Sequence, residues 1–313
     1  MLNNNDVAPS TGAFFQPFSR FARVEEVLAE DFLRLTRVLD DLTRRYNLPD
    51  HSDVNRERYP WSVGRLGTPE LYAARMWEYP FALLSAELQP GMECADIGCG
   101  MTAFTVYLQQ VANCHVVGVD PDLFESGIRY KGHGVSREYV RRTGLKVVQS
   151  GMESIPFQTG TFDRVFCLSV IEHLAPQVAR LGVQEMARIL KPGGRAILTI
   201  DVNLLSELSR PLDMVWDSGL IPLGEVDIRW PSRRFGIFDG GSEPADVFGL
   251  TLIKDDYPVE TAYSGTGGDP NPPVLPATRI PPLRFRAVQR SPRPLWREAA
   301  SRVKRACFLL WKG

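Results

Sequence analysis

The sequence has almost no excess charge, since its 313 residues carry a formal net charge of −1 at pH 7. This balance gives no overall attraction to a polyanion, so the composition does not favour nucleic-acid binding. Long apolar runs are missing too, and none reaches the roughly 18 residues that a membrane-spanning helix needs. Residues 1–12 lack the basic flank and apolar centre of a signal peptide. The sequence therefore predicts a cytoplasmic protein.

Cysteine is scarce, and its spacing excludes two common kinds of site. The five cysteines form no C-x-x-C pair, and their number is odd. A disulfide framework or a zinc ribbon is therefore not predicted, and reduced thiols are the expected state. The cysteines are Cys94, Cys99, Cys114, Cys167 and Cys307.

The first 90 residues predict a helical cap. Residues 1–22 read as a loose arm, whereas 24–46 place apolar side chains on one stripe at helical spacing. A second helix is predicted to begin near Thr68 and Pro69, an N-cap residue followed by a first-turn proline, and to end before Pro80.

The centre of the chain alternates short apolar runs with helical patterns. This alternation predicts an α/β fold, with a mostly parallel sheet that carries helices on both faces. The predicted strands are 93–97, 115–119, 145–149, 163–168 and 195–200, and the predicted helices are 102–112, 122–131 and 176–190.

The remainder of the chain is expected to complete this core and to extend it. Residues 203–220 have a helical pattern, 222–245 look irregular, and 246–254 predict a late strand. We therefore expect a core over 91–260, with an insertion at about 202–245. A C-terminal extension over 261–313 combines a Gly/Pro-rich loop with a basic tail.

A glycine-containing loop follows the first strand of this core. Gly98 and Gly100 allow a sharp turn and a close approach of a ligand, and Asp120 ends the next strand, where an acid can accept hydrogen bonds from a ribose. The spacing also satisfies the dinucleotide pattern G-x-G-x-x-G/A, so NAD and S-adenosylmethionine both fit it. Asp96 favours S-adenosylmethionine, because a carboxylate there opposes a pyrophosphate and suits an ammonium group.

Five segments in order at ordinary spacing resemble the class I S-adenosylmethionine-dependent methyltransferases, particularly the small-molecule branch with the ubiquinone and menaquinone enzymes. The resemblance covers about 90–201 and implies a Rossmann-like fold with S-adenosylmethionine as cofactor. Its markers are DIGCG at 96–100, VGVDPD at 117–122, IPF with FD at 155–163, IEHL at 171–174 and LKPGG at 190–194.

Carried over by position, the resemblance implies a role for several residues. Tyr79 and Arg75 lie in the segment before the first strand, from which they can meet the cofactor carboxylate or shape the substrate pocket, or simply pack as part of a helix. The cofactor-binding residues implied are Asp96, Gly98, Cys99, Gly100, Leu168 and Ser169 along the methionine part, Asp120 at the ribose, and Pro121, Gly151, Met152 and Glu153 around the adenine.

The sequence departs from its relatives at two places. Thr102 replaces a frequent third glycine, and its hydroxyl can cap the helix that follows. Ser169 stands where some quinone O-methyltransferases carry a metal-binding acid, so no metal site is predicted. His173 follows the fourth core strand and is the candidate general base, although a helix-start histidine bonded to backbone is an equal reading.

The sequence thus predicts methyl transfer from S-adenosylmethionine to a small-molecule acceptor, at a hydroxyl oxygen of a glycan, lipid-linked or secondary-metabolite substrate. An NAD-dependent oxidoreductase and a non-catalytic cofactor-binding protein remain alternatives. The basic segment 290–313 has an amphipathic helical pattern with tryptophans, which suits peripheral contact with an anionic membrane or packing on protein.

Overall fold

The computed structural model gives the arrangement of the central part of the chain. The predicted C-terminal extension, 261–313, lies outside the residues that it describes, as do most of the predicted helices 122–131 and 203–220. The described residues are 18–23, 25–48, 74–124, 134–202, 214–215, 218–229, 237–238 and 244–255.

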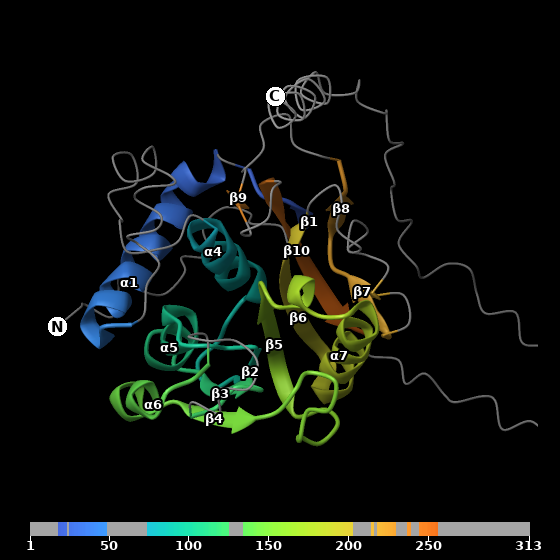
Figure 1. Ribbon diagram of the computed structural model, residues 1–313. Coiled ribbons are helices and arrows are strands. Elements are labelled where there is room, and N and C mark those ends of the chain that lie inside the picture. The colour runs from blue at the N-terminus through green and yellow to red at the C-terminus, as the bar shows by residue number, and fades with distance from the viewer. Residues whose placement is uncertain are drawn as a thin grey trace, which may run out of the picture. The chain divides into compact units, whose positions relative to one another are not determined.

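A sheet in the order β4-β3-β2-β5-β6-β10-β1-β8 forms the centre of the fold (Figure 1). The strands from β4 to β6 are parallel, and β10 is antiparallel to β6. The chain reverses its direction of travel across the sheet between β2 and β5, the position at which such sheets bind ligands. The mostly parallel α/β sheet expected from the sequence is confirmed. The strands are β2 (Glu93–Ile97), β3 (His115–Asp120), β4 (Lys146–Gln149), β5 (Phe162–Leu168), β6 (Leu190–Val202) and β10 (Pro244–Lys254).

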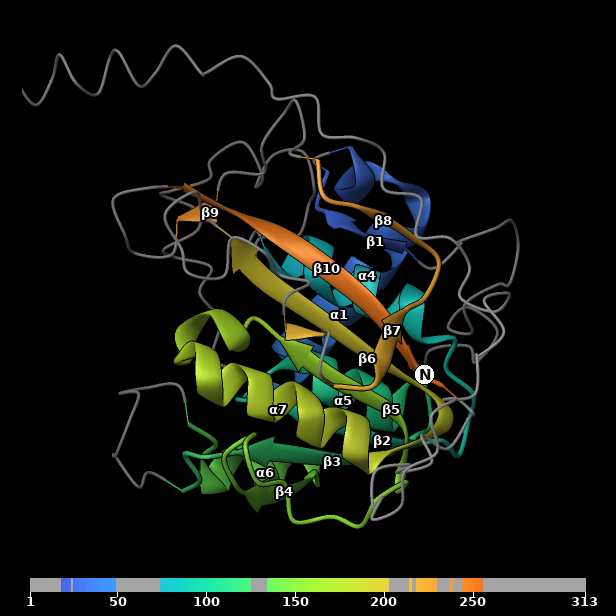
Figure 2. The ribbon, with the colours of Figure 1, turned by 90° about the vertical axis from the view of Figure 1, so that its right-hand side faces the viewer.

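Helices cover both faces of this sheet, as the apolar character of the parallel strands requires. One apolar cluster joins α1, α4, α5 and α6 to the sheet, and a second joins α7 to the opposite face (Figure 2). The helices are α1 (Glu30–Tyr46), α4 (Arg75–Ala86), α5 (Ala103–Gln110), α6 (Arg137–Thr143) and α7 (Pro176–Ile189), with short 3-10 turns η2 (Glu26–Leu28) and η3 (Ile171–His173).

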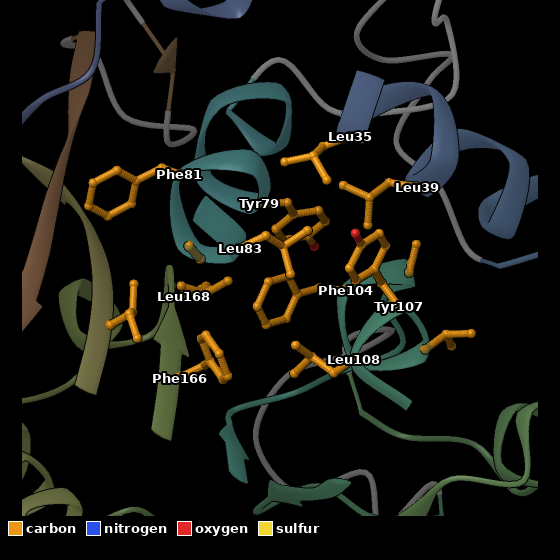
Figure 3. Packing of buried hydrophobic residues seen from close by; sticks show 14 of the residues in the cluster. Leu35, Leu39, Tyr79, Phe81, Leu83, Phe104, Tyr107, Leu108, Phe166 and Leu168 are labelled. Carbon is orange, nitrogen blue, oxygen red and sulfur yellow. The ribbon is translucent and has the colours of Figure 1, made fainter. Parts of the chain in front are cut away.

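Aromatic side chains fill the layer between α4, α5 and the sheet (Figure 3). Phe104 of α5 meets Tyr79 of α4 with ring centroids 5.3 Å apart, and Phe166 of β5 edge-on at 5.0 Å. On β10, a Cβ at Gly249 would come within 2.5 Å of the ring of Phe81. The close packing of α4 on the sheet therefore depends on a glycine, and it places the first turn of α4 beside the ends of β5 and β6.

The outer edge of β10 pairs with two segments from opposite parts of the chain. Arg20 of β1 (Phe18–Phe21) pairs with Gly249, and Ile221 of β7 (Leu220–Pro222) pairs with Ile253, both antiparallel. The prediction of a loose arm over 1–22 is therefore wrong for 18–21, because backbone pairing can order a short segment that carries no periodic pattern. Likewise, the irregular stretch predicted over 222–245 contains β8 (Glu225–Asp227), which pairs with β1, and β9 (Ile237–Phe238), which pairs with β10.

Two helices differ from the sequence prediction. Helix α4 continues through Pro80 to Ala86, because its apolar side chains are buried against the sheet and this packing offsets the lost backbone hydrogen bond. Helix α6 was not predicted. Its seven residues are few for a periodic pattern, but Ser136 accepts a hydrogen bond from the Tyr139 amide and caps it.

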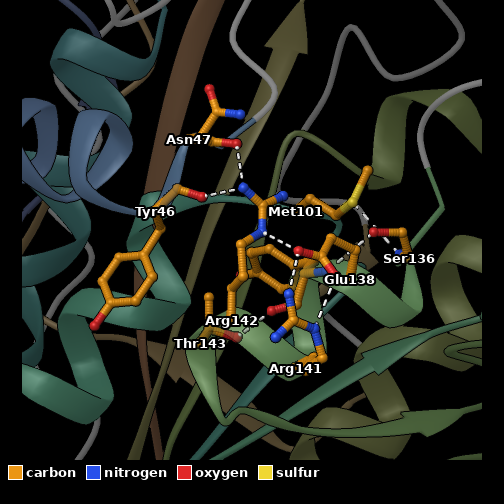
Figure 4. Close-up of polar contacts among 9 residues, drawn as sticks. Tyr46, Asn47, Met101, Ser136, Glu138, Arg141, Arg142 and Thr143 are labelled. Atoms are coloured by element: carbon orange, nitrogen blue, oxygen red, sulfur yellow. Dashed lines mark hydrogen bonds and ion pairs between the residues drawn. The ribbon is translucent and has the colours of Figure 1, made fainter.

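A cation ties the end of α1 to α6 (Figure 4). The Arg142 guanidinium donates hydrogen bonds to the carbonyl oxygens of Tyr46 and Asn47, at 2.6 and 3.0 Å. These carbonyls end α1, where helical partners are lacking and the helix dipole attracts positive charge. Arg142 thereby joins the N-terminal helix to the element that precedes β4.

Candidate functional site

The loop between β2 and α5 takes its shape from two glycines with positive φ. Gly98 has φ of 71° and Gly100 of 51°, and the Gly98 amide donates to the Val119 carbonyl at 2.7 Å. A Cβ at Gly98 would lie only 2.4 Å from Cγ2 of Val170, which follows β5. Both the backbone conformation and the close packing thus require glycine at position 98.

Asp96 is a buried carboxylate directly beneath this loop. Its Oδ2 accepts a hydrogen bond of 2.6 Å from the Thr105 hydroxyl of α5. Burial, assisted by the negative charge of Asp120, raises the pKa of Asp96 to about 7, although the Thr105 hydrogen bond and the Arg75 charge act in the opposite direction. The carboxylate therefore changes charge near neutral pH, and a cation beside it would stabilise the charged form.

Asp120 ends β3, and two backbone amides fix its carboxylate. The Gly100 amide donates to Oδ2 at 3.0 Å, and the Asp122 amide donates to Oδ1 at 2.9 Å. Each oxygen keeps a further lone pair for a hydroxyl donor. Burial raises the pKa of Asp120. Beside it, the Pro121 carbonyl accepts a hydrogen bond of 3.1 Å from the Gln149 side chain.

Two of the predicted cofactor residues turn their side chains into the protein core. A Cβ at Gly118 of β3 would lie 2.6 Å from the Cys99 thiol, and burial raises the pKa of that thiol well above its usual range. Met152 packs against Gly182 of α7 in the second apolar cluster. At both positions the side chain is turned away, so the backbone is left to line the predicted cofactor-binding site.

Glu78 joins α4 to the ends of β5 and β6. The side chain is fully buried, and its Oε1 accepts hydrogen bonds of 2.7 Å from the hydroxyls of Ser169 and Thr199. Its Oε2 accepts from the Arg75 guanidinium at 2.5 Å. Ser169 has a positive φ of 53°, a strained conformation for a residue with a Cβ. The shared carboxylate holds it in this conformation at the end of β5.

Arg75 and Tyr79 lie on the same side of α4. The Arg75 guanidinium is 5.5 Å from the centre of the Tyr79 ring. Burial lowers the pKa of Arg75, but the Glu78 carboxylate more than offsets this and keeps it above its usual range. Burial raises the pKa of Tyr79 to about 12, so its phenol stays neutral. Arg75 thus remains a cation at the carboxyl end of the sheet.

The turn after β5 directs two adjacent residues differently. His173 is exposed, and its backbone amide donates to the Val170 carbonyl. Glu172 points inward instead, where its Oε1 accepts from the Asp201 amide at 3.2 Å. Burial and the neighbouring Asp201 carboxylate raise the pKa of Glu172 well above its usual range.

Comparison with known proteins agrees with this geometry. Residues 95–198 match the family model described as a methyltransferase domain. The match begins within β2 and ends within β6, so it contains the loop, Asp120 and the turn after β5. The core of this chain is a class I methyltransferase domain. The cofactor of such a domain is S-adenosylmethionine, as the sequence predicted.

Relatives of the methyltransferase domain act on chemically different molecules. A tRNA U34 carboxymethyltransferase of Campylobacter curvus is 26% identical over 48% of this chain and 49% of its own length. The chloroplastic 2-methyl-6-phytyl-1,4-hydroquinone methyltransferase 1 of Oryza sativa subsp. japonica is 33% identical over 48% of this chain and 42% of its own. A sterol 24-C-methyltransferase of Gibberella zeae is 30% identical over 34% and 27%. The chain spans about half the length of these relatives or less.

Several polar residues at the methyltransferase site were not singled out from the sequence. In the sequence, each of them stands among mostly apolar neighbours, and its hydrogen-bond partner lies in another element. They are Thr105, Glu78, Thr199 and Asp201. One signal was available: Glu78 is a lone carboxylate in the apolar run after Trp77, three residues from Arg75. That spacing allows an ion pair on one helix face.

Proposed function

We propose that this chain transfers the methyl group of S-adenosylmethionine to a small-molecule acceptor, at a hydroxyl oxygen. The observation that carries the choice of cofactor is the buried Asp96 beneath the glycine loop. The nearby cation, Arg75, already pairs with Glu78. A pyrophosphate in this loop would meet the Asp96 carboxylate, whereas the ammonium group of S-adenosylmethionine would neutralise it. This argues against the NAD-dependent alternative.

The proposal assigns each part of the cofactor a partner among the described residues. Asp120 would accept hydrogen bonds from the ribose hydroxyls through the lone pairs that its amide partners leave. Asp96, Gly98 and Gly100 would line the methionine part, with Leu168 and Ser169 on its other side. The adenine would lie beside Pro121, Gly151, Glu153 and the backbone of Met152, whereas the backbone of Cys99 would follow the methionine part.

Methyl transfer requires alignment of the acceptor more than activation of the methyl group. S-adenosylmethionine carries its methyl group on a sulfonium, which is already a good leaving group, so the protein must orient the acceptor and exclude water. A hydroxyl acceptor also loses a proton, which a neighbouring base can take. His173 was the candidate from sequence. His173 is exposed, so a dissolved acceptor could reach it, whereas Glu172 beside it points inward.

Calorimetric titration separates this proposal from an oxidoreductase. We expect S-adenosylhomocysteine to bind the purified chain and NADH not to bind. Failure of S-adenosylhomocysteine to bind at millimolar concentration would refute the proposed cofactor.

The acceptor class needs a separate experiment, because one relative is named for tRNA and others for quinol and sterol substrates. Methyl-labelled S-adenosylmethionine can be supplied with the protein and either total tRNA or an organic extract of small metabolites. We expect label in the small molecules, in line with the balanced net charge of −1. Label in tRNA alone would overturn the small-molecule proposal and keep the methyltransferase.

A further inference from the structure

Glu78 of α4 is a buried carboxylate that holds two residues of the predicted cofactor site. Its Oε1 accepts hydrogen bonds of 2.7 Å from the hydroxyls of Ser169 and Thr199, near the ends of β5 and β6. Its Oε2 accepts a charge-assisted hydrogen bond of 2.5 Å from Arg75, one turn earlier on the same helix. The Glu78 side chain has no exposed surface, so it can act on a ligand only through these partners.

Arg75 is anchored on one side and accessible on the other. Glu78 holds its Nη1, while 26% of the Arg75 side chain remains exposed. Among the described residues, no other hydrogen-bond acceptor meets this guanidinium. Because the N–H donors of arginine lie in one plane, fixing Nη1 also restricts the direction of the others. Arg75 therefore presents a preset group of donors that fits a carboxylate.

The order of the strands places Ser169 across the glycine loop from the residue proposed to hold the ribose. Asp120 ends β3 on one side of β2, whereas Ser169 follows β5 on the other side. The residue after Ser169 packs against the glycine loop, and the charge of Arg75 acts on Asp96 beneath that loop. A ligand that spans the loop from Asp120 would therefore bring its far end to Ser169 and Arg75.

We propose that Glu78 is a positioning residue for the amino-acid end of the cofactor, and that it acts by fixing Arg75 and Ser169. This inference rests on the proposed function. The amino-acid end carries an ammonium and a carboxylate group, and Asp96 and Arg75 offer one charge of each sign to match them. Glu78 is fully buried whereas Arg75 is part exposed, so Glu78 directs the guanidinium without touching the ligand.

Ser169 is the second residue through which Glu78 acts. Its φ of 53° is sparsely populated for a residue with a Cβ, and such a conformation persists only where neighbouring contacts maintain it. The Ser169 hydroxyl donates to Glu78, and its amide donates to the Thr199 carbonyl. Loss of the Glu78 carboxylate would therefore let the end of β5 relax beside the methionine part of the site.

The test compares S-adenosylhomocysteine with 5′-methylthioadenosine, which has the same adenosine and thioether sulfur but lacks the amino-acid end. The variant is Glu78→Gln, which keeps the size of the side chain and an oxygen for the two hydroxyls but removes the charge that holds Arg75. We expect calorimetry to show about tenfold weaker binding of S-adenosylhomocysteine, the order for one weakened charge-assisted hydrogen bond. Binding of 5′-methylthioadenosine should be unchanged.

Glu87→Gln is the matched control, because Glu87 follows the last turn of the same helix and its exposed side chain pairs with Arg195. Both affinities of this variant should equal those of the wild type. Equal weakening of the two ligands in Glu78→Gln would indicate a structural role alone and overturn the inference, and so would no weakening of either. Failure of both ligands to bind the wild-type protein would instead refute the proposed function.

A second measurement uses the wild-type protein, in case Glu78→Gln does not fold or 5′-methylthioadenosine binds too weakly. Hydrogen exchange of the α4 amides is followed with and without S-adenosylhomocysteine. If the amino-acid end contacts the part of the helix that Glu78 organises, exchange should slow more over 75–79 than over 83–86. Equal slowing along the whole helix, or no slowing, would overturn the inference.

Discussion

At the scale of single residues, the site depends on carboxylates whose surroundings differ. Asp120 is fixed by two amides, Asp96 by one hydroxyl, and Glu78 by two hydroxyls and a guanidinium. The same functional group can therefore accept hydrogen bonds, change protonation or anchor a strand end. Which of these it does depends on the donors around it.

Replacing Asp120 tests the ribose contact. We expect Asp120→Ala to weaken binding of S-adenosylhomocysteine by about 1–3 kcal/mol, the range for a buried polar group that loses its hydrogen-bond partner. Titration calorimetry measures this change, and Asp41→Ala on the exposed face of α1 is the control. Unchanged affinity in Asp120→Ala would mean that the ribose is held elsewhere.

The raised pKa of Asp96 should make the affinity for the cofactor depend on pH. Because this pKa is about 7, Asp96 is mostly neutral below pH 7 and mostly charged above it. An ammonium group favours the charged form, so the affinity for S-adenosylmethionine should increase as pH rises from about 6 to 8. Asp96→Asn should reduce this increase in calorimetric titrations. The same slope in both proteins would exclude Asp96 as its source.

At the scale of elements, close contacts between loops, strands and helices set the geometry of the site. Gly118 leaves room for the Cys99 thiol, and Gly98 leaves room for Val170. These contacts bring the glycine loop against β3 and against the turn after β5. The loop is consequently held between β3 and the turn after β5.

The contact between Gly118 and Cys99 can be tested by a pair of substitutions. Gly118→Ala should lower the free energy of unfolding by about 1–3 kcal/mol, because its Cβ would overlap the thiol 2.6 Å away. Adding Cys99→Ala should recover part of this loss by removing the sulfur atom. Chemical denaturation measures both, and equal stability of the single and double variants would show that another contact is responsible.

The junction between α1 and α6 gives a second prediction at this scale. Arg142→Ala should lower the free energy of unfolding by about 1–2 kcal/mol, since two α1 carbonyls lose a charged donor. Arg141→Ala is the control, because its pair with Glu138 is exposed and screened by water, so its loss should be smaller. Similar losses in both variants would contradict a capping role for Arg142.

At the scale of the whole molecule, segments from the two ends of the described chain complete one sheet. β1 and β7 pair with the outer edge of β10, and β8 pairs with β1. Among the described residues, no helix is long and apolar enough to cross a membrane. The basic segment 290–313, for which the sequence predicts peripheral membrane contact, lies outside the described residues.

Membrane contact by residues 290–313 remains a prediction, and it can be tested directly. This segment contains Trp296 and Trp311 together with seven cations and one acid, a composition that suits an anionic lipid surface. We expect the full chain to sediment with anionic liposomes and a variant without 290–313 to remain in the supernatant. Equal pelleting of both proteins would argue against a membrane role.

The sequence by itself determined the fold class and favoured S-adenosylmethionine as the cofactor. Alternating strand and helix patterns predicted the sheet, and Asp96, Gly98, Gly100 and Asp120 lie within 25 residues of one another, so local spacing was enough to recognise the loop. Backbone conformation and strand ends are largely local properties, which short-range patterns can record.

Only the tertiary structure decided what surrounds this loop. Glu78 meets Ser169 and Thr199 across 91 and 121 residues of chain, and no local pattern encodes such a distance. Adjacent residues can also differ, since the turn after β5 directs Glu172 to the Asp201 amide and exposes His173. The pairing of β1 with β10 likewise depends on backbone hydrogen bonds to a strand more than 200 residues away, to which side-chain pattern contributes little.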